Sequence, residues 1–301
     1  MASNKKEWID AFKHLRLHFS LLLMPVYLFA LSQTVLISYV NASLTFIILH
    51  LLVYPASNVF NSYYDNDQGS VGGLKNPPPK NFKMLVLANI LDGIALIIAI
   101  QIDFIFALLV LVYILASRLY SHRNVRLKKF PIIGFIVIFI FQGGFTYYLT
   151  ANGVFGLNSN TQHLSQFCLT GIRIQDIYLA LVATSFQIGA IYPLTQIYQH
   201  QSDLADGVTT LSYKLGYRGT FLFAGAMFGI ATLFYYLHFK ETDINSFYLF
   251  TLVQIPIIGY FVYWASKVWK DTKHADYKHT MYMNIIAAVV LNLFFLYLVI
   301  K

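Results

Sequence analysis

Long apolar runs separated by short polar segments occupy almost the whole chain. The runs are continuous rather than alternating with a period of two, which favours membrane-spanning helices over the strands of a barrel. Each run is close to the roughly 20 residues that a helix needs to cross a bilayer. The nine predicted spans are 17–38, 42–61, 84–101, 103–119, 131–150, 177–197, 219–238, 247–266 and 281–300. We therefore expect an all-α integral membrane protein of about nine transmembrane helices, with residues 1–301 forming a single polytopic domain.

Composition supports a membrane protein. The chain is 57% hydrophobic and 11% charged, whereas about a quarter of the residues of a soluble domain are charged. The first residues are polar and no small-residue cleavage site follows the first span, so we expect this span to be retained. The single cysteine, Cys168, excludes an internal disulfide and a cysteine-based metal site.

The distribution of basic residues predicts the orientation. If the N-terminus is cytoplasmic, 18 Lys and Arg residues lie on the cytoplasmic side and only three lie on the other. Such a bias predicts a cytoplasmic N-terminus and an extracytoplasmic C-terminus in a multi-pass protein of the cell membrane. It also accounts for the net charge of +8 without a nucleic-acid partner.

A first polar cluster follows the second predicted span. Asn58, Asn61 and Asp65 have i, i+3, i+7 spacing, so they lie on one face of the predicted helix. The segment 67–79 contains three glycines and three consecutive prolines, so it is predicted to be a loop. This loop can fold over a site and present backbone N–H groups and Lys75. The alternative interpretation is an ordinary solvated loop with capping side chains.

A second cluster of similar design ends the sixth span. Gln196, Gln199 and Asp203 share one helix face, and Asp206 follows one turn later if the helix continues. His200 is interpreted as an interfacial histidine, because no second His or Cys stands at metal-ligand spacing.

Both clusters fall on the predicted cytoplasmic side. Carboxylates at the mouth of an apolar bundle repel one another unless a cation lies between them, and Mg²⁺ takes oxygen ligands that it often shares with a substrate phosphate. The sequence therefore predicts a membrane-embedded site that holds a diphosphate through Mg²⁺.

With these motifs the chain resembles the UbiA superfamily of intramembrane prenyltransferases over essentially its whole length. The family pattern after the second span is Asn-x-x-x-Asp-x-x-x-Asp; Asn61 and Asp65 match it, and Gly69 departs from it. The pattern after the sixth span is Asp-x-x-x-Asp, then Gly and Thr-Leu; Asp203 matches, as do Gly207, Thr210 and Leu211, but Gln199 replaces the first Asp. Each motif thus lacks one carboxylate.

The resemblance implies Mg²⁺-dependent transfer of a prenyl group from a prenyl diphosphate to a lipophilic acceptor, of the aromatic or quinone-precursor type, under a cap on the cytoplasmic side. It implies no particular protein partner. Asp65 and Asp203 are the implied catalytic residues. The implied metal ligands are Asn61, Asp65, Asp67, Asp203 and Asp206. The implied substrate-binding residues are Asn58, Gln199, Lys75, Arg126 and Lys128.

Two hypotheses compete for the positions that lack a carboxylate. In one, the nearby Asp67 and Asp206 take over. In the other, Gln199 coordinates through its amide oxygen and Asp206 only caps the following loop.

Other functions remain open at this point. A transporter or channel with a cation site would need ionisable residues near the bilayer midplane, and Asp92, in the third predicted span, is the only intramembrane acid candidate. A CDP-alcohol phosphotransferase would carry Asp-Gly-x-x-Ala-Arg, whereas Asp206-Gly207 is followed by Val-Thr-Thr. An inactive member of the UbiA superfamily is the third alternative, because of the two absent carboxylates.

Overall fold

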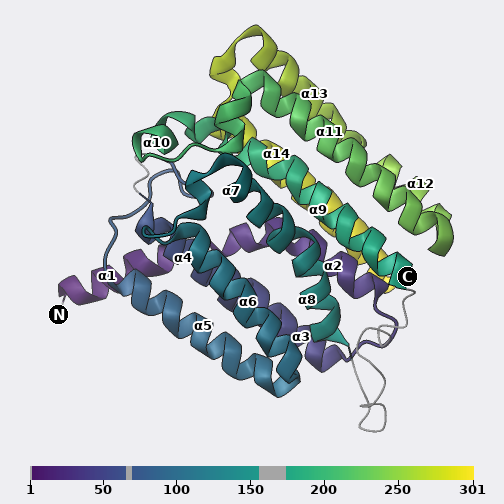
Figure 1. Ribbon diagram of the computed structural model, residues 1–301, viewed down its shortest axis with the longest axis horizontal. Coiled ribbons are helices and arrows are strands. Elements are labelled where there is room, and N and C mark those ends of the chain that lie inside the picture. The colour runs from purple at the N-terminus through teal and green to yellow at the C-terminus, as the bar shows by residue number, and fades with distance from the viewer. Residues whose placement is uncertain (1, 66–69, 156–173) are drawn as a thin grey trace.

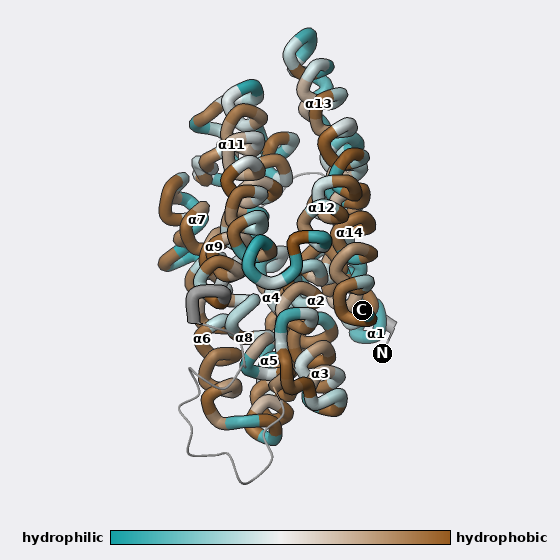
Figure 2. The backbone as a smooth tube through the Cα atoms, turned by 90° about the vertical axis from the view of Figure 1, so that its right-hand side faces the viewer, coloured by the Kyte–Doolittle hydropathy of each residue, from teal (hydrophilic) through white to brown (hydrophobic). Residues whose placement is uncertain are grey.

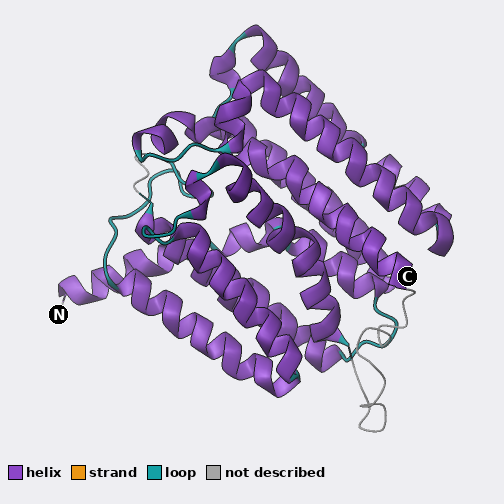
Figure 3. Ribbon diagram, in the orientation of Figure 1, coloured by secondary structure: helices purple, strands orange, loops and turns teal. Residues whose placement is uncertain are grey.

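The computed structural model describes residues 2–65, 70–155 and 174–301, and these residues fold almost entirely into helices (Figures 1 and 3). Within them, β structure is limited to two isolated bridges, Ile37 with Phe155 and Val71 with Leu74. The all-α fold class expected from the sequence is confirmed.

The first half of the chain contains eight α-helices and four short helical segments of other types. Their bounds are α1 Ala2–Lys13, η1 Leu17–Leu22, α2 Met24–Gln33, α3 Tyr39–Phe46, η2 Ile47–Val53, α4 Tyr54–Tyr64, α5 Lys83–Ile102, α6 Phe104–Ser121, η3 Leu127–Lys129, α7 Pro131–Ile138, η4 Phe139–Gly144 and α8 Phe145–Val154. The second half continues with α9 Ile174–Gln196, η6 Ile197–Gln199, α10 His200–Ala205, α11 Leu211–Thr242, α12 Ile244–Val253, α13 Ile255–Lys270, η7 Thr272–His274 and α14 Tyr277–Ile300.

Eight helices of the described residues are long and apolar enough to cross a membrane, and they correspond to the second to ninth predicted spans. The first span differs from the prediction of one continuous helix over 17–38. Residues Asn4–Leu22 and Met24–Gln33 pass the same test only as a pair bent by 47°. Arg16 adopts a left-handed conformation (φ 48°) before η1, and Pro25 lies in the first turn of α2, so the helix is interrupted here.

The helices pack as a bundle in which segments far apart in sequence are neighbours. Helix α9 runs along α11, α14 along α2, and α5 along both α4 and α6. The bodies of the helices are predominantly apolar, whereas polar residues gather in α1 and the connections (Figure 2). On α5, Ile90, Ile94 and Ile97 form an exposed apolar stripe of the kind that faces lipid. The chain is a multi-pass membrane protein.

A close helix contact positions one wall of the site described below. Gly143 lies in η4 against Ser185 of α9, and a Cβ atom on Gly143 would come within 2.4 Å of the Ser185 Cα. The backbone N–H of Gly144 donates to Ser185 Oγ at 2.9 Å. Small residues allow such close approach between membrane helices. This contact fixes the neighbouring Phe141 and Gln142 beside α9.

Asp92, the intramembrane acid, forms an ion pair with Arg118 of α6. The guanidinium of Arg118 also lies 3.9 Å from the centre of the Phe60 ring. Both side chains are largely buried. The pair therefore joins α5 to α6 and has a structural explanation that requires no transported ion.

We expect Arg118→Met to destabilise the protein by about 3–5 kcal/mol, because it leaves the Asp92 carboxylate buried without its cation. The double variant Asp92→Leu with Arg118→Met should recover most of this loss. Thermal unfolding in detergent, followed by intrinsic fluorescence, measures both. An Arg118→Met protein that melts like the wild type would show that the pair contributes nothing to the fold.

Candidate active site

A cavity of about 290 Å³ lies where α4, α6 and the α9–α10 segment end near one another. Val71 and Gly72 of the following loop and residues of η1 also line it. The loops that close this end of the bundle gather at the left of Figure 3. The cavity thus brings the two polar clusters of the sequence together.

On α4, α6 and the α9–α10 segment, the lining changes from polar to apolar with distance from the helix end. Residues spaced three or four apart face the cavity. Its charged side chains lie at the helix ends, whereas the amides of Gln142 in η4 and Asn284 in α14 line it from inside their spans. In order from the polar end, the lining residues are Asp65, Asn61, Asn58 and Tyr54 on α4; Ser121, Ser117 and Tyr113 on α6; and Asp203, Gln199, Thr195, Tyr192 and Ile188 on the α9–α10 segment. Such a cavity suits a molecule with an anionic head and an apolar tail.

Asp65 is the C-terminal cap of α4 and is only 5% exposed. Its carboxylate forms an ion pair with Lys128, and Arg126 Nη2 lies 3.8 Å from Asp65 Oδ1. A cation was expected between the carboxylates. In the structure, Lys128 and Arg126 of the α6–α7 connection place positive charge beside Asp65.

Asn61 lies one turn before Asp65. Its Oδ1 accepts from Ser121 Oγ at 2.8 Å and from Lys128 Nζ at 3.4 Å. These contacts orient the amide oxygen toward the same basic group that binds Asp65.

Lys128 is the central cation of the cavity, with a side chain 11% exposed. Burial lowers the pKa of Lys128 to about 8, although the carboxylates of Asp203 and Asp206 oppose this shift. Desolvation penalises the charged amine, so a further anion in the cavity would be a favourable partner for it.

Arg126 and Asp206 form a pair beside the cavity. The Arg126 guanidinium binds the Asp206 carboxylate, and Nη1 donates to the Asp206 backbone oxygen at 3.0 Å. Helix α10 ends at Ala205, and Asp206 is its C-terminal cap before Gly207, whose φ is +71°. The extra helical turn that would have placed Asp206 beside Asp203 is not formed, and Asp206 is not among the cavity-lining residues.

Gln199 does line the cavity, together with Gln196 and Asp203. Gln196 Nε2 donates to Tyr192 Oη at 2.8 Å, and Tyr192 is hydrogen-bonded to Tyr120. Gln199, unlike Asp206, therefore lies on the cavity wall.

Two predicted substrate-binding residues are not among the residues that line the cavity. Lys75 is exposed, and Arg126 lies beside the cavity. Asp67 lies outside the described residues, as does Gly69, so its role as a metal ligand stays a prediction.

The comparisons identify the family. The model of the UbiA prenyltransferase family matches residues 21–286. The chain belongs to the UbiA prenyltransferase family.

Solved structures share the fold of this UbiA-family chain at low sequence identity. A UbiA homolog from Archaeoglobus fulgidus bound to GPP and Mg²⁺ is 15% identical, with a TM-score of 0.69 over 97% of this chain and 100% of that one. An apo UbiA homolog from Aeropyrum pernix K1 is 14% identical, with a TM-score of 0.63 over 92% and 97%. A digeranylgeranylglyceryl phosphate synthase is 18% identical, with a TM-score of 0.61 over 98% and 99%. A search of curated proteins found no match.

Arg16 is a cavity residue that the sequence did not single out. Its Nη1 donates to the Gly72 backbone oxygen and its Nη2 to that of Asn58, both at 3.1 Å. Arg16 therefore ties the loop after α4 to the helix itself. In the sequence it is one basic residue among those preceding the first span, so positive-inside bias alone accounted for it.

We expect Arg16→Met to raise the KM for a diphosphate substrate about tenfold and to speed proteolysis within residues 70–80, because two charge-assisted hydrogen bonds are lost. Arg218→Met is the matched control, since Arg218 Nη2 also donates to a backbone oxygen, that of Trp269 at 2.9 Å, away from this cavity. Equal effects of the two variants would contradict a specific role for Arg16.

The cavity offers the donor set of a hard divalent cation. The amide oxygen of Asn61 and the carboxylates of Asp65 and Asp203 all line it, and oxygen atoms are the ligands of Mg²⁺. The residues present therefore fit such an ion.

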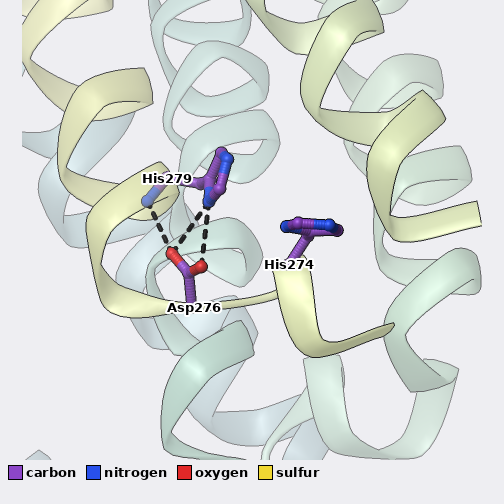
Figure 4. Close-up of side chains that lie close together, drawn as sticks. All are labelled: His274, Asp276 and His279. Carbon is purple, nitrogen blue, oxygen red and sulfur yellow. Dashed lines mark hydrogen bonds and ion pairs between the residues drawn. The ribbon is translucent and has the colours of Figure 1, made fainter. Parts of the chain in front are cut away.

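A second group of metal-ligand type lies at the α13–α14 connection, where His274, Asp276 and His279 have donor atoms within 4.8 Å of one another (Figure 4). Asp276 caps α14 by accepting from the His279 backbone N–H at 2.8 Å, and its carboxylate also contacts His279 Nδ1 at 2.9 Å. N-capping of α14 by Asp276 explains this arrangement, and the positive end of a helix does not favour a cation.

Proposed function

We propose that this UbiA-family chain transfers a prenyl group from a prenyl diphosphate to a lipophilic acceptor of the aromatic or quinone-precursor type, with Mg²⁺ as cofactor. One observation carries the proposal: Asp65 and Asp203, from the two motifs, line the polar end of a single cavity whose other end is apolar. The homolog structures with GPP and Mg²⁺ and with DMAPP and Mg²⁺ support it, because they share the fold.

Asn61, Asp65 and Asp203 are proposed to hold the metal, with Asp67 as a further ligand from the loop. Bound Mg²⁺ would supply charge that stabilises the departing diphosphate. Gln199 is proposed to contribute its amide to the same end of the cavity. Asp206 is assigned a different role from the one expected from the sequence: it positions Arg126.

Lys128 and Arg126 are proposed to bind the diphosphate. In the structure Lys128 neutralises Asp65. If Asp65 held a metal ion instead, Lys128 would be able to donate to the diphosphate. The basic side chains thus keep the carboxylates paired before the substrate arrives.

The apolar end is proposed to protect the reacting carbon. Tyr54, Tyr113 and Phe141 line this part of the cavity, and they exclude water from an allylic group as its C–O bond breaks. Their ring faces also stabilise positive charge. The new bond forms to a carbon or oxygen atom of the acceptor, which then releases a proton.

The proposal is tested with purified protein in nanodiscs, radiolabelled prenyl diphosphates of several chain lengths, and a panel of aromatic, quinone-precursor and glycerol-phosphate acceptors. We expect a prenylated product and free diphosphate that both require Mg²⁺ and disappear with EDTA. If the protein neither bound a donor nor formed a product with any combination of substrates, the proposal would be overturned in favour of an inactive member. Donor binding without product would retain the donor site and refute the acceptor class.

A further inference from the structure

His200 lies in the segment that carries the second motif, but it does not line the cavity. It directly follows Gln199 and precedes Asp203 by one helical turn, and both of these residues are on the cavity wall. The sequence suggested only an interfacial histidine at this position, whereas the structure leaves His200 only 4% exposed. Its side chain therefore points into the protein, away from the cavity that its neighbours line.

The His200 ring lies at one end of a chain of buried hydrogen bonds. Its Nε2 is 2.8 Å from Ser212 Oγ, which is 3.0 Å from Thr220 Oγ1. Thr220 Oγ1 donates to the backbone oxygen of Gly216 at 2.8 Å and lies 3.1 Å from that of Ser212. Ser212 and Thr220 are both fully buried.

The direction of this chain follows from the number of protons available. A hydroxyl group has one proton to donate. Thr220 gives its proton to a backbone oxygen, so it accepts in its contact with Ser212. Ser212 therefore donates to Thr220, and its contact with His200 requires a proton on His200 Nε2. The chain of donors runs from the His200 ring to the Gly216 carbonyl.

The chain ends at a break in α11. Gly216 has a φ of +67° and a ψ of 174°, which interrupt the helix there. Tyr217, the next residue, stacks on the His200 ring with a centroid distance of 4.8 Å and an interplanar angle of 23°. Hydrogen bonds and ring stacking thus hold His200 against the first turns of α11.

Helix α10 depends on such an anchor. It has only six residues, and His200 is the one buried residue among them. An isolated helix of this length is unstable and needs tertiary contacts. A 3-10 turn precedes α10, and Gly207, with a φ of +71°, follows it, so neither neighbouring segment extends it as a regular helix.

We propose, on the basis of the proposed function, that His200 is a positioning residue for the metal and diphosphate end of the cavity. Through Ser212 and Thr220 it fixes α10 to α11, and this attachment holds Gln199 and Asp203 on the cavity wall. His200 itself contacts neither the metal ion nor the diphosphate.

The test compares His200→Phe with a matched control, His238→Phe. Phenylalanine keeps an aromatic ring at each position and removes the hydrogen bond. His238 is also fully buried, with Nε2 2.8 Å from Gln33 Oε1, and it does not line the cavity. Electron paramagnetic resonance titration of the full chain in nanodiscs measures binding of Mn²⁺ with inorganic diphosphate, and thermal unfolding measures stability.

Both variants should unfold at a lower temperature than the wild type. Only His200→Phe should also weaken Mn²⁺–diphosphate binding, by about tenfold, as the loss of an outer-shell partner does at metal sites. A folded His200→Phe protein that binds as tightly as the wild type, or an equal loss of binding in His238→Phe, would overturn the proposal. A wild-type protein without Mn²⁺–diphosphate binding would instead refute the proposed metal site, and the positioning role with it.

Two further variants show whether the hydrogen bond itself is responsible. In His200→Gln the amide nitrogen is as many bonds from Cα as Nε2 of histidine, so it can donate to Ser212 Oγ. This variant should regain most of the affinity that His200→Phe loses, whereas Ser212→Ala should lose affinity as His200→Phe does. A folded His200→Gln protein without this recovery, or a Ser212→Ala protein with wild-type affinity, would contradict positioning through the hydrogen-bond chain.

Discussion

Asp65→Asn and Asp203→Asn are each expected to lower prenyl transfer by about 100- to 10,000-fold. Each variant removes one negative charge from the polar end of the cavity while keeping the size of the side chain. Truncating a buried charge contact typically costs 2–5 kcal/mol, and the proposed contacts gain strength as the diphosphate leaves. Initial rates at saturating Mg²⁺ and donor measure the loss.

The matched control is Asp271→Asn. Asp271 is exposed and caps η7, where its Oδ1 accepts from the Lys273 backbone N–H at 3.0 Å. Its variant should transfer prenyl groups at the wild-type rate. Because Asp65→Asn also removes the partner of Lys128, unfolding temperatures must be compared before rates are interpreted. A folded Asp65→Asn or Asp203→Asn protein with near-normal turnover would refute the assignment of the catalytic pair.

The helical repeat made the central part of the site predictable. Asn58, Asn61 and Asp65 were expected on one helix face, and the structure places all three on the cavity wall. The same holds for Gln199 and Asp203, although a short 3-10 turn over Ile197–Gln199 interrupts the helix between the α9 and α10 segments. Spacing of three or four residues survives such local changes, because the lining residues remain about one turn apart.

The parts that could not be predicted depend on where helices stop and on which ions pair. Asp206 was expected to share the face of Asp203 if the helix continued, but α10 ends at Ala205, and Arg126 from a distant loop binds the Asp206 carboxylate. Arg16 faces the cavity because its left-handed backbone turns the chain before η1. Neither the end of a short helix nor a left-handed arginine has a distinct pattern in one sequence. The same is true of the bend in the first span, which lies between Leu22 and Met24.

The role of Lys128 leads to a prediction in which two binding constants move in opposite directions. Lys128 pairs with Asp65 and approaches Asn61, which are also proposed to hold the metal ion. In the absence of diphosphate, the ammonium group and the metal ion therefore compete for the same carboxylate. When diphosphate is present, the ammonium group can bind this second anion. The metal ion and the ammonium group then no longer compete, and both help to bind diphosphate.

When no diphosphate is present, Lys128→Met should consequently bind Mn²⁺ about tenfold more tightly than the wild type. It should bind inorganic diphosphate with Mn²⁺ about 10- to 100-fold more weakly, because a buried charge-assisted contact is lost. Electron paramagnetic resonance titration of free Mn²⁺, with and without diphosphate, measures both constants in one preparation.

Lys129→Met is the control: Lys129 is exposed and lies over the Phe130 ring rather than in the cavity, so both constants should stay unchanged. If Lys128→Met instead weakened the binding of both Mn²⁺ and diphosphate, Lys128 would only support the fold. If the Lys128→Met and Lys129→Met proteins instead behaved alike, general surface charge rather than exchange at Asp65 would control binding.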